Sequence, residues 1–152
     1  MIVLAGRNLA KMEAAKAELD ELGVESHLCK TDIADRAQVQ ALAAFAASLG
    51  DVKQIIHTSG VSPSDTATEN IIKNNAAGTV NMVEAFYPVL AEGGVIINFS
   101  SVAAYTMPQT DEWTQAFEAW NESDFYDRLL SHAHAPESSL TTNRKQRKIS
   151  WS

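Results

Sequence analysis

Four apolar runs of the sequence each end in polar residues that could bind a ligand or act on it. These residues are Gly6–Arg7, Thr31–Asp32–Ile33, Thr58–Ser59–Gly60 and Ser100–Ser101. A guanidinium pairs with phosphate, glycine lets the backbone approach a ligand closely, and a hydroxyl can hydrogen-bond a substrate oxygen. Because ligands of an open parallel sheet bind beyond the carboxyl ends of its strands, we expect these segments to lie along one edge of such a sheet.

The elements that must position these residues alternate between strand and helix. Apolar runs predict strands at 2–5, 24–30 and 52–57, and a fourth from Val95 to the two serines. Helical spacing of apolar residues predicts helices after Asn8, over 37–49 and over 69–90, with Gly93–Gly94 ending the last. This alternation predicts an α/β fold with a parallel sheet and right-handed crossovers.

The pattern changes after Pro108. Residues 109–136 carry aromatic side chains among acidic ones, which predicts one or two amphipathic helices forming an insert or lid. Trp113, Phe117 and Trp120 follow helical spacing, so we expect them to pack or to cover a substrate. Residues 137–152 have no apolar periodicity and predict a disordered basic tail, with a nucleic-acid-binding arm as the alternative.

Composition limits the classes of partner. A net charge of −7 argues against a nucleic-acid surface, and no apolar run approaches the roughly 20 residues of a membrane span. The single cysteine, Cys29, rules out an internal disulfide and favours a reducing compartment, so we expect a cytoplasmic protein. The histidines show no ligand spacing with Cys29 or a carboxylate, and we expect no metal.

Taken together, residues 1–108 resemble the short-chain dehydrogenase/reductase family. Ser101 is similar to the family's serine after the fifth strand, which polarises the substrate carbonyl. Asn75, with Gly78, is similar to the Asn-x-x-Gly whose asparagine supports a proton relay. The resemblance therefore implies that Ser101 and Asn75 are catalytic, although Ser101 could instead cap the following turn and Asn74 could be the buried asparagine.

The same resemblance implies a nicotinamide cofactor. Asp32–Ile33 is similar to the pair that contacts the adenine ring, and Thr58–Ser59–Gly60 occupies the place of the family's Asn-Ala-Gly loop beside the cofactor. Arg7 ends the strand where an acidic residue would favour NAD, so arginine favours the 2′-phosphate of NADP. NAD stays the alternative cofactor, and an ordinary solvent-exposed arginine is the alternative role of Arg7.

Two parts of the family pattern are absent from the sequence. It contains no glycine-rich pyrophosphate turn, and no Tyr-x-x-x-Lys pair, in which lysine lowers the tyrosine pKa for proton donation. We therefore expect a chain truncated at both ends: a partial Rossmann domain at 1–108 with family strands 2 to 5, the helical insert at 109–136 and the tail at 137–152. Without the central first strand, the sheet either closes in the family order 3-2-4-5 or separates into halves.

We therefore expect an incomplete three-layer fold with a Rossmann-like parallel sheet. We expect the protein to descend from an NADP-preferring oxidoreductase. Its substrate would be a small-molecule carbonyl or alcohol, and the chain alone would be catalytically incompetent. The alternative is a non-catalytic remnant whose sheet edges or tail mediate association, as a homo-oligomer or with another protein. Exposed edges and apolar faces also predict low stability and aggregation.

Overall fold

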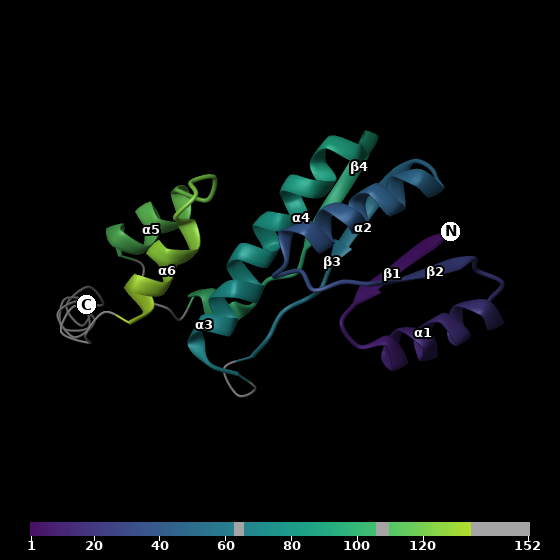
Figure 1. Cartoon of the computed structure of the whole chain (residues 1–152), viewed down its shortest axis with the longest axis horizontal. Helices are drawn as coiled ribbons and strands as arrows, with labels where there is room; N and C mark the ends of the chain where they lie inside the picture. The colour runs from purple at the N-terminus through teal and green to yellow at the C-terminus, as the bar shows by residue number, and fades with distance from the viewer. Residues whose placement is uncertain (63–65, 106–109, 135–152) are drawn as a thin grey trace, which may run out of the picture.

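The computed structural model describes residues 1–62, 66–105 and 110–134 (Figure 1). The predicted tail lies outside these residues, as do both ends of the predicted insert. The elements in chain order are β1 (Ile2–Gly6), α1 (Leu9–Glu21), β2 (Ser26–Lys30), α2 (Arg36–Leu49), β3 (Val52–His57), α3 (Thr68–Ile71), the π-helical turn η1 (Ile72–Ala77), α4 (Gly78–Phe86), the 3-10 turn η2 (Tyr87–Val89), β4 (Leu90–Asn98), the 3-10 turn η3 (Val102–Tyr105), α5 (Asp111–Glu118) and α6 (Phe125–Ala133).

The strands form two separate pairs, both parallel. β1 pairs with β2 from Ile2 opposite Ser26 to Gly6 opposite Lys30, and β3 pairs with β4 from Val52 opposite Leu90 to His57 opposite Asn98. Within the described residues no backbone hydrogen bond joins β1 to β3. Of the two arrangements that the sequence allowed, the sheet therefore adopts the separated one.

Side-chain caps fix the beginnings of the first two long helices where the sequence placed them. Asn8 accepts a hydrogen bond from the Lys11 backbone N–H at 3.1 Å, and Asp35 accepts one from the Gln38 backbone N–H at 3.1 Å. Each bond satisfies a donor that lacks a partner within the first turn of the helix. The Gln38 backbone N–H, joined by the Gln38 side chain, also holds the pKa of Asp35 below its usual value.

The prediction of one helix over 69–90 with a glycine terminator is wrong. The helical segment passes through the π-helical turn η1 and ends at Phe86, because Pro88 follows and forces the tighter turn η2. β4 already begins at Leu90, so Gly93 and Gly94 lie inside this strand. Gly93 has φ of 73°, and the pairing register shifts between Val52 and Gln54, so the glycines accommodate an irregularity in the ladder.

One hydrophobic cluster connects the two strand pairs. Its buried residues come from α2, β3 and α4, and they are Val39, Leu42, Ala43, Val52, Met82 and Phe86. Val3 and Cys29 of the first pair and Ile55 and Ile96 of the second pack against this cluster. Helices α2 and α4 thus cover one face of both pairs, which explains how they stay together without a shared hydrogen-bond ladder.

The opposite faces of the two pairs differ. α1 lies on the far side of β1 and β2 from α2 and α4 (Figure 1), and Met12 of α1 is buried against Gly6. On the second pair, Ile56 lies opposite Ile97, and both are exposed together with Val95. The first pair is therefore layered between helices, and the second pair is covered on one face.

One or two amphipathic helices were predicted for this segment; α5 and α6 lie there and form a second cluster with η1. Ala116, Phe125 and Leu129 are buried against Ile72. Trp113 stacks on Phe117 with ring centroids 5.9 Å apart, whereas Trp120 is half-exposed. Within the described residues, every helix is too short or too polar to cross a membrane.

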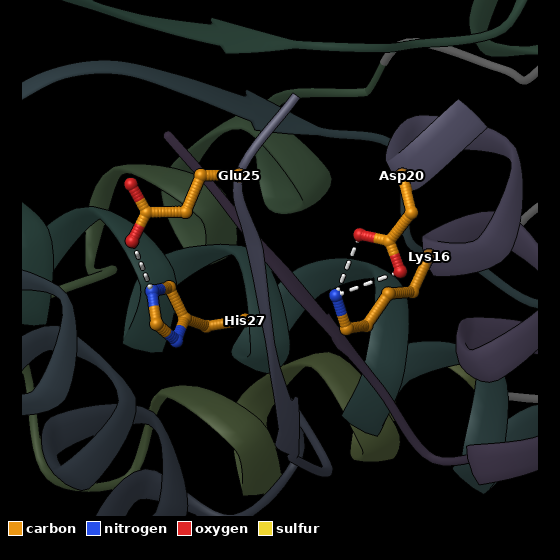
Figure 2. A network of polar contacts seen from close by, with 4 residues as sticks. All are labelled: Lys16, Asp20, Glu25 and His27. Atoms are coloured by element: carbon orange, nitrogen blue, oxygen red, sulfur yellow. Dashed lines mark hydrogen bonds and ion pairs between the residues drawn. The ribbon is translucent and has the colours of Figure 1, made fainter. Parts of the chain in front are cut away.

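Polar contacts near α1 lie at the surface. Lys16 pairs with Asp20 one helical turn away at 2.8 Å, and His27 contacts Glu25 at 3.3 Å (Figure 2). Exposed pairs of this kind contribute little to stability, because water already solvates both charges. The burial of Met12 against Gly6 therefore contributes more to holding α1 in place than these pairs do.

Candidate functional site

Two adjoining hollows lie at the carboxyl ends of β1, β2 and β3. The larger, about 360 Å³, is lined by residues that include Arg7, Asp32, Ala34, Val61, Lys73 and Asn74. The smaller, about 190 Å³, is lined by residues that include Arg7, Thr31, Ile33, Gly60 and Asn74. We call the two together the strand-end site; Arg7 and Asn74 are common to both hollows.

Helix α4 holds the end of β2 at this site. The Ile33 side chain lies so close to Gly78 that a Cβ there would come within 2.9 Å of Ile33 Cδ1. Asn81, one turn further along, donates its Nδ2–H to the Ile33 carbonyl at 2.9 Å. Glycine at position 78 therefore permits the close approach that brings the β2 end beside the β3 end.

The Asn75 side chain holds the loop after β3. Its Oδ1 accepts a hydrogen bond from the Val61 N–H at 2.8 Å, and its Nδ2 donates to the Val61 carbonyl at 2.9 Å. The amide thus pairs with one residue through both of its polar atoms, as a neighbouring strand would. Asn75 positions the loop that borders both hollows.

His57, at the end of β3, contacts the helical turn that carries Asn75 through Thr79. Its exposed fraction is 4%, and its Nε2 lies 3.1 Å from Thr79 Oγ1. Because the Thr79 hydroxyl donates its one proton to the Asn75 carbonyl at 2.9 Å, His57 donates to Thr79. Burial lowers the pKa of His57, so the ring stays neutral and stabilises the turn as a hydrogen-bond donor.

Most of the residues predicted for the site come together. Arg7, Asp32 and Ile33 line the strand-end site, as do Thr58, Ser59 and Gly60. Asn75 borders it through the Val61 contact. Ser101 differs: it lies exposed between β4 and η3 and lines neither hollow.

Sequence reasoning missed Lys73, which lines the larger hollow, and Asn81, which holds the Ile33 carbonyl. Asn74 is the buried asparagine, as the alternative reading of the sequence allowed, whereas Asn75 is exposed. Four asparagines within one apolar helical segment, Asn70, Asn74, Asn75 and Asn81, were the available signal, because asparagine disfavours helix interiors.

The chemistry available at the strand-end site is that of binding a nucleotide. Arg7 and Lys73 supply cationic groups for phosphate, while Asp32 and Asn74 supply acceptors for hydroxyl or amino groups. Ala34 and Val61 supply apolar surface on which a base can lie. Within the described residues, no group of three or more histidine, cysteine or acidic side chains is placed to hold a metal ion.

Parallel strands, crossover helices and a polar site at the strand ends define an incomplete Rossmann-like α/β protein. The sequence profile described as short chain dehydrogenase matches residues 1–113. The chain therefore belongs to the short-chain dehydrogenase family.

Individual relatives agree with this assignment. A sulfoacetaldehyde reductase of Chromohalobacter salexigens is 30% identical over 114 residues, covering 67% of this chain and 45% of that protein. The human protein named carbonyl reductase [NADPH] 3 is 27% identical over 109 residues, covering 66% and 39%. Among solved structures, a short chain dehydrogenase/reductase from Burkholderia phymatum in complex with NAD has a TM-score of 0.62 at 24% identity, covering 85% of this chain and 47% of that one. The chain spans less than half the length of each of these proteins.

Proposed function

We propose that the chain forms the nucleotide-binding part of an NADP-preferring oxidoreductase that transfers hydride between nicotinamide and a small-molecule carbonyl or alcohol. The convergence of Arg7, Asp32 and the Thr58–Gly60 loop on one site is the observation that carries this proposal. Relatives named as reductases, one of them for NADPH, support the reaction class. The cytoplasmic location favoured by the single cysteine belongs to the same proposal.

Each residue has a distinct role in this proposal. Arg7 binds the 2′-phosphate of NADP, with Lys73 as a second cation in the same hollow. Asp32 and Ile33 lie at the adenosine end, and the Thr58–Gly60 loop runs beside the rest of the cofactor. Bound nicotinamide supplies or accepts the hydride.

The proposed chemical step uses residues outside the two hollows. Ser101 polarises the substrate oxygen, and Asn75 supports the proton relay from its place beside Val61. The sequence contains no Tyr-x-x-x-Lys pair to donate the proton and no glycine-rich pyrophosphate turn. We therefore expect binding of the adenosine end and no turnover from residues 1–152 alone.

Titration of the purified chain with NADPH and with NADH, followed by cofactor fluorescence, tests the proposal. We expect tighter binding of NADPH, and an Arg7→Leu variant that binds the two equally, because only NADPH carries the 2′-phosphate. Lys11→Leu removes a comparable exposed charge outside the site and should keep the preference. Failure of both cofactors to bind, or robust turnover on a carbonyl panel, would contradict the proposal.

A second function, association with another copy of the chain, is favoured by the uncovered face of β3 and β4. Ile56, Val95 and Ile97 are exposed on this face, and Phe99 beyond β4 is exposed as well. Apolar side chains gathered on one sheet face favour contact with another surface over contact with water. Light scattering separates the alternatives, since a monodisperse monomer at high concentration would exclude self-association.

A further inference from the structure

β1 and β3 run alongside each other in the same direction and are not joined (Figure 1). At their amino ends, Met1 Cε lies 4.0 Å from the point where a Cβ on Gly50 would be. At their carboxyl ends, Gly6 and the Thr58–Gly60 loop line the smaller hollow. Over most of their length the Cα atoms of the two strands stay more than 8 Å apart. Two strands that flank a third lie roughly 10 Å apart, so the space between β1 and β3, which we call the slot, leaves room for one more strand.

The edge of β1 that borders the slot has backbone groups without a strand partner. β2 occupies the other edge, where the Gly6 carbonyl accepts a hydrogen bond from the Thr31 N–H at 3.0 Å. Successive residues of a strand direct their N–H and C=O groups to opposite sides, so residues that alternate with Gly6 point away from β2. Val3 and Ala5 therefore direct their peptide groups into the slot.

β3 presents the same kind of edge. The His57 carbonyl accepts a hydrogen bond from the Phe99 N–H at 3.1 Å, which joins His57 to the β4 side. The preceding residue, Ile56, therefore directs its N–H and C=O into the slot. A row of unpaired peptide groups is a template for another strand, and two such rows border this one space. A strand in the slot would form hydrogen bonds along both of its edges, whereas a strand added outside β2 or β4 would form them along one.

The side chains around the slot define the chemistry of the strand that fits it. Val3 and Ile55 pack on the shared hydrophobic cluster from the two sides of the slot, so this face favours apolar side chains. On the opposite face the neighbours are Leu4 and Ile56, by alternation along each strand. Apolar residues on both faces are typical of a strand inside a parallel sheet. The net charge of −7 favours a segment with basic residues at its ends.

We propose that the slot binds an extended apolar segment of another polypeptide, which pairs in parallel with β1 and β3 and joins the two strand pairs into one sheet. β1 has five residues and β3 has six, so the paired part of the segment matches that length. Hydrogen bonds between main chains supply the affinity, and the two apolar faces supply the selectivity. The inference goes beyond cofactor binding and does not depend on it.

A synthetic peptide tests the proposal on the unmodified chain. The probe is a fluorescein-labelled peptide of alternating valine and isoleucine with two lysines at each end, and fluorescence anisotropy measures its dissociation constant. N-methylation of either of two consecutive central residues should weaken binding about tenfold, because a strand in the slot uses the N–H groups on both of its edges. Hydrogen exchange of the chain followed by NMR should slow at the Val3, Ala5 and Ile56 amides when the peptide binds.

A pair of proline variants locates the binding edge. Ala5→Pro removes an N–H that points into the slot and leaves the hydrogen bonds to β2 in place, so it should weaken peptide binding about tenfold. Lys30→Pro is the matched control: Thr31 bonds to β1, so the Lys30 N–H points to the outer edge of β2. This variant should bind the peptide as the unmodified chain does.

Three results would overturn the proposal. Absence of peptide binding would show that the slot does not accept a strand. A loss of affinity from only one of the two N-methylated peptides would place the strand at an outer edge. Slow exchange at Val3, Ala5 and Ile56 in a dimer detected by light scattering, without peptide, would make a second copy of the chain the occupant. The peptide series needs no variant, so it decides the question even if Ala5→Pro does not fold.

Discussion

The two strand pairs have the same parallel pairing and different surroundings. β1 and β2 lie between α1 on one face and α2 with α4 on the other, whereas β3 and β4 are covered on one face. The continuous apolar run Val95–Ile96–Ile97 is typical of a strand buried on both faces, yet only Ile96 packs against the core. The sequence of an apolar strand thus indicates that both of its faces favour burial, and it does not indicate which segment buries them.

The largest effect should come from breaking the core that the two pairs share. Phe86, 3% exposed, belongs to the cluster that strands of both pairs contact. Phe86→Ala should cost about 3–5 kcal/mol of unfolding free energy, a large share of what a small domain has. Urea denaturation measures this loss. Phe117→Ala, at a half-exposed position, is the control, and an equal cost for both variants would contradict the shared core.

Adding a methyl group at Gly78 should separate the β2 end from α4. The new Cβ would come within 2.9 Å of Ile33 Cδ1 and 3.4 Å of the Ile33 carbonyl oxygen. We expect Gly78→Ala to cost about 1–3 kcal/mol by overpacking and to weaken NADPH binding. Ile33→Val removes the nearest atom, so it should recover part of the loss when combined with Gly78→Ala. A double-mutant cycle with no coupling between the two positions would rule out this contact.

One substitution made on each pair should measure the difference in cover directly. Leu28 lies on the face of β2 that α1 covers, by alternation with Cys29, and Ile97 lies on the uncovered face of β4. Leu28→Thr should cost about 1–2 kcal/mol, whereas Ile97→Thr should stay within about 0.5 kcal/mol. Ile97→Thr should also lower any self-association seen by light scattering. Equal costs would mean that another surface buries the face of Ile97.

The smallest effect should appear as a pH dependence of stability. Burial lowers the pKa of His57 in the folded chain, so below about pH 6.5 the unfolded chain takes up the proton first. Stability should therefore be complete above that pH and decline as the pH falls, with a slope of at most about 1.4 kcal/mol per pH unit from this group. His57→Gln keeps a donor for Thr79 and should reduce the slope. An unchanged slope in that variant would assign the dependence to other groups.

The features that the sequence predicted correctly depend on neighbouring residues. The helices after Asn8 and over 37–49 begin at caps that act within three residues, and strand-end chemistry follows from the direction of parallel strands. The early start of β4 was missed because Gly93 and Gly94 are common helix terminators as well as strand irregularities. Asn81 was missed because its partner, the Ile33 carbonyl, lies 48 residues earlier in the chain. The side-chain roles that depend on tertiary contacts therefore required the structure.

The pairing of Asn75 with Val61 has a consequence for how the two positions tolerate substitution. Both contacts end on the peptide groups of Val61, so these hydrogen bonds need no particular side chain at 61 as long as the residue is not proline, although ligand binding in the larger hollow would favour an apolar one. At position 75 few side chains offer a donor and an acceptor at that reach, and aspartate would lose one of them. Saturation mutagenesis scored by folding stability should thus tolerate many residues at 61 and few at 75, although the two residues share the same pair of hydrogen bonds.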